Sequence, residues 1–475
     1  MNLVWQRLTL SYLPPKQYIS TSYLHRLLVG LLLPWREASV LLRWGDEIAV
    51  TLLSLVYALA PFVSSTLIGV LLIACVGFWL LFTLADQPTS LTNSFVTPIH
   101  LVVLLYWGIA VVATALSPVK KAALNDLATL TLYLLLFALC ARVLRSPRLR
   151  SAIITVYLHV SLIVSVYGLR QARYGAAQLA TWVDPESPLS KTTRVYSYLG
   201  NPNLLAGYLV PAVVFSLIAI FVWQGWVRKA LALTMLIVNT LCLVLTYSRG
   251  GWIGLLVAML TASALLVYWQ SVRMPQFWRR WSLPVLFGSL FGVLILAVVF
   301  IEPVRFRVLS IFADRQDSSN NFRRNVWDAV FEMIGDRPVI GIGPGHNSFN
   351  KIYPLYQRPR YSALSAYSIF LEVAVETGFV GLGCFLWLIV VTFNTALLQL
   401  NRLRQVGNLE GFWLIGAFAT LFGMLAHGTV DTIWFRPEVN TLWWLMVALI
   451  ASYWTPLTQD RTQASDSPQP EPTAN

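Results

Sequence analysis

Residues 203–223 read NLLAGYLVPAVVFSLIAIFVW and contain no charged side chain. A run of about 20 apolar residues is long enough for an α-helix to cross the hydrocarbon core of a bilayer. Two similar runs follow at 229–247 and 250–270, separated by short loops. This stretch therefore predicts consecutive membrane-spanning helices.

The same pattern extends over most of the 475-residue chain. Further apolar runs lie at 48–63, 65–85, 98–116, 122–141, 151–169, 282–301, 370–399, 411–428 and 440–454. The chain is 57% hydrophobic and only 12% charged, whereas soluble domains carry about 25% charged residues. We therefore predict an all-α, polytopic integral membrane protein with about 10–12 transmembrane helices. The first two runs and the last are short or closely abutted, so ten or eleven spans are also compatible with the pattern.

The runs divide the chain into five predicted parts. These are a cytoplasmic or interfacial segment at 1–46, transmembrane helices 1–9 at 47–301, a large extracytoplasmic loop at 302–369, transmembrane helices 10–12 at 370–457, and a disordered cytoplasmic tail at 458–475. Apolar residues at helical spacing in 322–334 predict a surface helix within the large loop.

Basic residues in the short loops indicate the orientation. Four loops that lie on one side if the N-terminus is cytoplasmic (142–150, 224–229, 271–281 and 400–409) carry eleven Lys and Arg residues, against four in the short loops opposite. Positive charge is enriched in cytoplasmic loops. We therefore predict a multi-pass protein of the bacterial inner membrane with both termini in the cytoplasm.

Several classes of partner are excluded by the pattern. The net charge is +13, but no Lys/Arg-rich block with interleaved aromatic residues exists, so nucleic acid is not expected. The segment 340–349, IGIGPGHNSF, lacks the Lys-Ser/Thr pair of a phosphate loop and predicts a tight turn, so no nucleotide is expected. The four cysteines are scattered singly, which predicts neither a metal site nor a disulfide, and no cofactor is expected.

Two arginines are candidates for anion binding. Arg249, in TYSRGG at 246–251, lies between two spans, where a guanidinium either faces a polar cavity or reaches the interface and caps helix ends. Arg194 precedes the segment YSYLGNPNLLAGY at 196–208, in which Asn201 and Asn203 flank a proline and Asn203 is expected to cap the following helix.

Acidic and histidine side chains supply candidates for proton transfer. Glu372 and Glu376 are four residues apart, so they share one helix face, and each is either a general base or the partner of a loop arginine. His427 and Asp431 are also one helical turn apart, as in an acid that orients a histidine, although a structural hydrogen bond fits equally well. His346 carries the same two alternatives.

Taken together, these motifs resemble the O-antigen ligase and polymerase superfamily. The matching pieces, in order, are YLGNPNLLAGYL at 198–209, LTYSRGGWIGL at 245–255, RPVIGIGPGHNSF at 337–349, LEVAVETGFVG at 371–381 and AHGTVD at 426–431. YLGNPNLLA, LTYSRGGW, DSSNNFR and LSAYS resemble more closely the cyanobacterial branch named IctB, which is associated with bicarbonate transport.

The resemblance implies transfer of a glycan from an undecaprenyl-pyrophosphate donor at the outer face of the inner membrane, without metal or ATP. It implies that Arg249 grips the donor pyrophosphate and that Arg194 is a second phosphate contact, with Arg324 a further anion-binding candidate. Where the ligases carry a His-Asn pair, counted back from Glu376, this chain has Tyr367 and Ser368.

Two functions from different classes follow from these observations. The first is an envelope glycan transferase or polymerase, with Arg249, Glu376, Tyr367 and His427 as catalytic candidates. The second is an IctB-type bicarbonate transporter, or an accessory to inorganic carbon accumulation. Membrane lipid and either a lipid-linked glycan or bicarbonate are the expected partners, and Asn201, Asn203, His346 and Asp431 are expected to support the site.

Overall fold

The computed structural model describes residues 3–11, 39–85, 96–176, 194–312 and 318–455. Within these ranges the chain is helical and no β-strand occurs. The tail at 458–475 and most of the segment at 1–46 lie outside the described residues.

The helices follow one another along the chain with short connections. The first half contains α1 (Leu3–Leu8), α5 (Val40–Arg43), α6 (Gly45–Leu59), α7 (Ser65–Leu84), α8 (Pro98–Ala115), α9 (Lys120–Val143), α10 (Pro147–Tyr174), η2 (Ser197–Leu199), α11 (Pro202–Val222) and α12 (Trp226–Leu245). The second half contains α13 (Arg249–Gln270), α14 (Gln276–Phe300), α15 (Glu302–Phe312), α16 (Ser318–Asp336), α17 (His346–Ile352), η4 (Tyr353–Leu355), α18 (Ile369–Val406), α19 (Gly411–Gly428), η5 (Ile433–Phe435) and α20 (Pro437–Ser452).

Ten of the described helices are long and apolar enough to cross a membrane: α7 to α14, α18 and α19. The protein is therefore an all-α, multi-pass membrane protein. The runs predicted at 48–63 and 440–454 are also helical, but α6 and α20 have only 15 and 16 residues. The surface helix predicted at 322–334 is present within α16.

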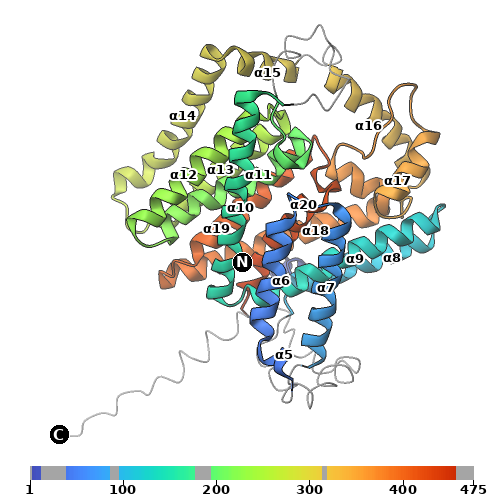
Figure 1. Cartoon of the computed structure of the whole chain (residues 1–475), viewed down its shortest axis with the longest axis horizontal. Helices are drawn as coiled ribbons and strands as arrows, with labels where there is room; N and C mark the ends of the chain where they lie inside the picture. The colour runs from blue at the N-terminus through green and yellow to red at the C-terminus, as the bar shows by residue number, and fades with distance from the viewer. Residues whose placement is uncertain (1–2, 12–38, 86–95, 177–193, 313–317, 456–475) are drawn as a thin grey trace.

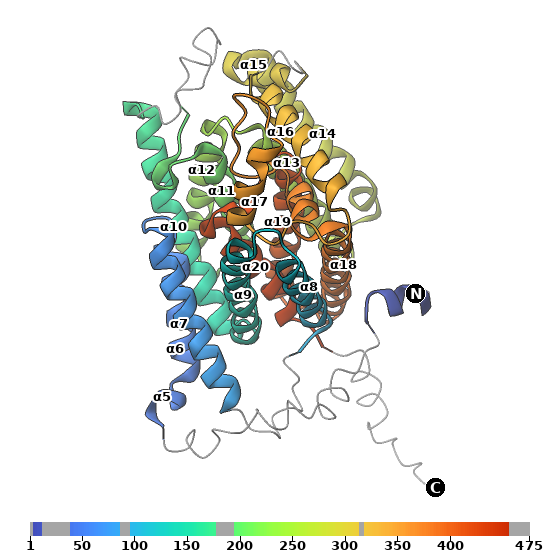
Figure 2. The ribbon, with the colours of Figure 1, turned by 90° about the vertical axis from the view of Figure 1, so that its right-hand side faces the viewer.

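The bundle has two distinct ends. α15 and α16 lie at one end, and α1 and α5 lie at or toward the other (Figure 2). We call the end that carries α15, α16 and α17 the capped end, because these helices cover it.

Two helices form the centre of the membrane bundle. In α11 and α19, 78% and 83% of the most apolar window is buried, whereas none of the described side chains in the corresponding window of α14 is buried. A stripe of small residues on α13, formed by Gly250, Gly254, Ala258 and Ala262, allows its close approach to α19. A Cβ added to Gly254 would lie 2.8 Å from the carbonyl oxygen of Gly423, so the two backbones are in direct contact, as is common between membrane helices.

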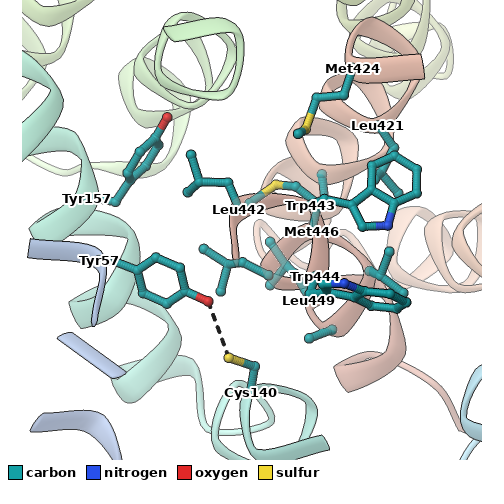
Figure 3. Close-up of a cluster of buried hydrophobic side chains, with 14 of the residues drawn as sticks. Tyr57, Cys140, Tyr157, Leu421, Met424, Leu442, Trp443, Trp444, Met446 and Leu449 are labelled. Carbon is teal, nitrogen blue, oxygen red and sulfur yellow. Dashed lines mark hydrogen bonds between the residues drawn. The ribbon is translucent and has the colours of Figure 1, made fainter. Parts of the chain in front are cut away.

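Large aromatic and aliphatic side chains fill the remaining core. Tyr57, Trp443 and Trp444 lie among the leucines and methionines of α19 and α20 (Figure 3). The hydroxyl of Tyr57 lies 3.5 Å from the sulfur of Cys140. All four cysteines are buried.

A second apolar core lies under the capped end. Val326, Val330 and Met333 of α16 are buried together with Phe349 of α17 and Ala374 of α18. This core fixes α16 and α17 against the beginning of α18, which positions the side chains of the candidate site.

Candidate functional site

Three arginines meet at the capped end, each from a different part of the chain. Arg194 precedes η2, Arg249 is the first residue of α13, and Arg323 belongs to α16. The Nε of Arg194 donates a hydrogen bond to the carbonyl of Thr246 (2.9 Å), in the connection that leads to Arg249. We call these three residues the arginine cluster.

Asn203 and Asp431 hold the arginine cluster together. Asn203 Oδ1 accepts a hydrogen bond from Nη2 of Arg194 (3.0 Å), and its Nδ2 donates to Oδ2 of Asp431 (2.8 Å). The same carboxylate oxygen lies 3.6 Å from Nη2 of Arg323. One asparagine and one aspartate thus connect the loop before α11, the loop after α19, and α16.

The N-cap of α11 differs from the prediction. Asn201, not Asn203, caps the helix, because its Oδ1 accepts from the backbone N–H groups of Asn203 (2.8 Å) and Leu204 (3.3 Å). Pro202 then occupies the first helical position, where its missing N–H costs nothing. This register frees the Asn203 side chain for Arg194 and Asp431.

The charge in this region is not balanced. Arg194 and Arg323 share one close carboxylate among the described residues, Asp431, so the positive charge of these two side chains exceeds the negative charge beside them. Burial, together with the positive charges of Arg323 and Arg249, lowers the pKa of Arg194 to about 10, against the opposing effect of Asp431. In addition, Nε of Arg323 is buried without a hydrogen-bond partner among the described residues. Unused donors and surplus positive charge suit an oxyanion such as phosphate.

The backbone is strained around the arginine cluster. Ser197, Tyr247 and Tyr367 have φ angles of 51°, 50° and 49°, in the left-handed region that residues other than glycine rarely adopt. Ser197 is three residues after Arg194, Tyr247 is two residues before Arg249, and Tyr367 directly precedes Ser368 at the start of α18. Strained conformations of this kind concentrate at functional sites.

Tyr367 borders the arginine cluster. Its ring packs edge-to-face on Phe322, with ring centroids 5.5 Å apart, next to Arg323 in sequence. Burial and, to a smaller extent, the charge of Asp431 raise the pKa of Tyr367 to about 12, against the effect of Arg323. The hydroxyl therefore keeps its proton at neutral pH, so it is suited to donate a hydrogen bond rather than to accept a proton.

His427 lies between the arginine cluster and the core. Its side chain is fully buried in α19, and neither ring nitrogen has a hydrogen-bond partner among the described residues. It packs against Gly250, where an added Cβ would lie 2.6 Å from Cδ2 of the histidine. Glycine next to Arg249 thus provides the space that the imidazole ring occupies.

Glu376 does not join the arginines but lines a neighbouring cavity of about 180 Å³. Glu372, Asp126 and His346 line the same cavity, and the backbone N–H of Gly345 donates a hydrogen bond to Glu376. The shared helix face predicted for the two glutamates is confirmed. We call this space the carboxylate cavity.

The carboxylate cavity and the arginine cluster are close neighbours. Oε2 of Glu372 accepts hydrogen bonds from the backbone N–H of Ala366 (2.5 Å) and the hydroxyl of Thr432 (3.5 Å). Ala366 is adjacent to Tyr367, and Thr432 is adjacent to Asp431. A single carboxylate is therefore bonded to both segments that approach the arginine cluster.

A break in α18 shapes the cavity wall. At Gly378 the helix takes a φ of 68°, and the preceding turn 340–345 pairs with the broken backbone. Ile342 and Gly343 donate to the carbonyls of Val375 and Glu376 (both 2.9 Å), while Phe379 donates to the carbonyl of Pro338 (2.7 Å). Gly341, Gly343 and Gly345 all have positive φ, so the predicted tight turn is confirmed.

Sequence reasoning missed two residues of these sites. The first is Arg323, which belongs to the arginine cluster and lies beside Asp431, whereas its neighbour Arg324 is exposed. Asp126 is buried in α9, where its carboxylate accepts from Nδ2 of Asn347 (2.6 Å) and from the backbone N–H of Ser348 (3.0 Å). The position of Asp126 within the apolar run at 122–141 was the sequence signal that could have identified it, since a carboxylate is seldom placed in a membrane span without a partner.

A family model described as O-Antigen ligase matches residues 230–386. Over these residues the chain is similar to the O-antigen ligase family. The matched stretch contains Arg249, Arg323, Tyr367 and Glu376, and it supports the superfamily resemblance drawn from the sequence motifs. Comparison with curated proteins found no match.

Proposed function

We propose that this protein is an envelope glycan transferase or polymerase that uses an undecaprenyl-pyrophosphate-linked donor at the outer face of the bacterial inner membrane. The observation that carries the proposal is the arginine cluster, which brings three guanidinium groups to the capped end of the bundle, two of which share the carboxylate of Asp431. A pyrophosphate diester, with one negative charge on each phosphate, matches this surplus. The capped end then faces outward and both termini are cytoplasmic.

The proposed reaction is the displacement of a lipid pyrophosphate by an acceptor hydroxyl. The acceptor oxygen forms a bond to the anomeric carbon of the donor sugar while the bond from that carbon to the phosphate oxygen breaks. The electron pair leaves with the lipid pyrophosphate, and the proton of the acceptor passes to a protein base. Arginines that neutralise the departing pyrophosphate lower the energy of the transition state.

The residues present divide between these tasks. Arg194, Arg249 and Arg323 hold the pyrophosphate, and the protonated hydroxyl of Tyr367 donates a further hydrogen bond. Glu372 and Glu376, in the neighbouring carboxylate cavity, are the acceptors for the proton. Asn203 and Asp431 are positioning residues that hold the arginines.

Close packing below the arginine cluster favours transfer over bicarbonate transport. A transport path needs polar groups that continue through the membrane from the anion site. Beneath Arg249, however, α13 is pressed against α19 at Gly254 and Gly423, and the next small residue of the stripe, Ala258, is fully buried.

Binding of undecaprenyl pyrophosphate to the full-length protein in lipid nanodiscs tests the site. Arg323→Gln should weaken binding at least about tenfold, because a hydrogen bond to a charged group contributes about 1.5–3 kcal/mol. Arg324→Gln is the matched control, because Arg324 is exposed and adjacent, and its affinity should stay within about twofold. Equal losses in both variants would contradict the assignment of Arg323.

The class of activity is tested in cells. A strain that lacks the protein should lose a long-chain surface or exported glycan, and the wild-type gene but not Arg249→Ala should restore it. An unchanged glycan profile together with lost uptake of labelled bicarbonate would favour the transporter instead.

A further inference from the structure

Five arginines lie at the end of the bundle opposite the capped end. α13 begins at Arg249 in the arginine cluster, so its last residue, Gln270, marks this opposite end. The five residues belong to the connection from α13 to α14, to the start of α14 and to the last turns of α18: Arg273, Arg279, Arg280, Arg402 and Arg404. We call them the basic patch.

Side-chain contacts join the two parts of the basic patch. Nη2 of Arg404 donates a hydrogen bond to Oγ of Ser271 (2.7 Å), and its guanidinium carbon lies 4.0 Å from the centroid of the Tyr268 ring. The hydroxyl of Tyr268 in turn donates to Oδ1 of Asn401. The end of α18 is therefore fixed against the connection that leads to α14, although 133 positions of the chain separate Ser271 from Arg404.

The positive charge of the basic patch is not neutralised within the described part of the chain. No Asp or Glu occurs in residues 249–301 or 377–409, the two stretches that contain the five arginines. The side chains of Arg273, Arg279 and Arg280 are exposed and make no hydrogen bond or ion pair with any described residue. Unused guanidinium N–H groups are the donors that pair best with phosphate.

Aromatic rings flank the arginine pair of α14. Phe277, Trp278 and Trp281 are 64%, 50% and 47% exposed. The helix that they begin is apolar enough to cross a membrane, and none of its described side chains is buried, so lipid surrounds it. Tryptophan rings at the end of such a helix lie at the level of the lipid headgroups. The arginines beside them are therefore at the depth of the lipid phosphates.

We propose that the basic patch binds the headgroup of an anionic phospholipid of the phosphatidylglycerol class. Four to eight arginines or lysines next to a membrane span are the composition that attracts anionic lipid. The phosphate pairs with the guanidinium groups, and the exposed rings contact the glycerol and the upper acyl chains. Because the patch lies at the opposite end from the arginine cluster, this inference does not rest on the proposed function.

Lipid competition on the full-length protein in detergent tests the proposal. Equal amounts of phosphatidylglycerol and phosphatidylcholine with the same acyl chains are added, and native mass spectrometry gives the ratio that stays bound. Phosphatidylglycerol should bind at least about tenfold more tightly, since each arginine near an anionic headgroup contributes roughly fivefold in affinity. High salt should reduce this preference by screening. Equal retention of the two lipids, or a preference that salt does not change, would overturn the proposal.

Paired substitutions locate the bound lipid. Arg279→Gln with Arg280→Gln should lower the preference about tenfold. The matched control is Arg228→Gln with Lys229→Gln, an exposed basic pair in the first turn of α12, and it should change the preference less than about twofold. Equal losses in both pairs would show that only net charge matters and would refute the site. Arg323→Gln should leave the preference intact, and a loss there would instead place the anionic lipid in the arginine cluster.

The chain's own residues 456–475 are the alternative occupant. They carry three acidic side chains, Asp460, Asp466 and Glu471, and one arginine, too few to neutralise five arginines. Replacing the three acids together by Asn, Asn and Gln in the full-length chain should leave the phosphatidylglycerol preference at the wild-type value. A preference that arises only after these substitutions would show that this segment covers the basic patch and would refute the lipid assignment.

Discussion

Substituting Gly378 with alanine should destabilise the protein strongly, because this glycine forms the break in α18. Its φ of 68° and ψ of −172° lie in a region that essentially only glycine adopts, which costs an alanine about 1–3 kcal/mol. An added Cβ would also lie 2.2 Å from both the carbonyl carbon and the oxygen of Val339. These are backbone atoms held by the hydrogen bonds from Phe379 to Pro338 and from Val380 to Val339, so they cannot move aside easily.

Overpacking of this kind costs typically about 1–3 kcal/mol, so the total expected loss in the free energy of unfolding is about 2–6 kcal/mol. Gly383→Ala is the matched control, since it lies in the same helix with nothing within 4 Å of its added Cβ. Alanine there should be neutral or stabilise by about 0.5–1 kcal/mol. Thermal unfolding in detergent, followed by tryptophan fluorescence, measures both variants. Wild-type stability of Gly378→Ala, or an equal loss in Gly383→Ala, would refute the account of the break.

Three further predictions concern charge and buried polarity. The affinity for undecaprenyl pyrophosphate, measured by calorimetry, should follow only the ligand's own ionisation from pH 6 to 9 and should fall as the pH rises through about 10, where Arg194 loses its proton. The raised pKa of Tyr367 contributes stability that is present below pH 10 and is lost as the pH rises through about 12. The melting temperature of Tyr367→Phe should therefore fall less than that of the wild type over this alkaline range. Asn239→Leu should lower the free energy of unfolding by about 1–2 kcal/mol, measured by denaturant titration. Inside the bundle, Oδ1 of Asn239 accepts a hydrogen bond from the hydroxyl of Ser165 (2.7 Å), and its Nδ2 lies 3.4 Å from the hydroxyl of Ser216. Unchanged stability would show that this network is dispensable.

The membrane helices could be predicted because hydrophobicity is a local property of the sequence. The runs at 203–223, 229–247 and 250–270 correspond to α11, α12 and α13 with ends that differ by at most three residues. The burial of each helix was not predictable in the same way. Both α11 and α14 are strongly apolar, yet α11 is central whereas no described side chain of α14 is buried. Hydropathy cannot tell the two apart, since lipid and protein neighbours select the same apolar side chains.

The two sites depend on contacts that the sequence does not encode locally. Arg323 and Arg324 differ by about 100° around α16, and only the packing of that helix decides which one faces Asp431. Asp126 meets its partner Asn347 across 221 positions of the chain. The break at Gly378 interrupts a continuous helical pattern because a distant turn supplies hydrogen bonds that the helix would otherwise make itself. Arg249 and Glu376, by contrast, could be named in advance, because ionisable groups beside apolar spans are rare.

The peripheral position of α14 has a consequence for how the sequence can change over evolutionary time. None of its described side chains is buried, so almost any apolar residue of similar length satisfies the lipid that surrounds it. In α19, where 83% of the apolar window is enclosed by protein, each substitution must also fit its neighbours. Among homologues α14 should therefore diverge rapidly while keeping its hydropathy, and α19 should change slowly and in concert with α13.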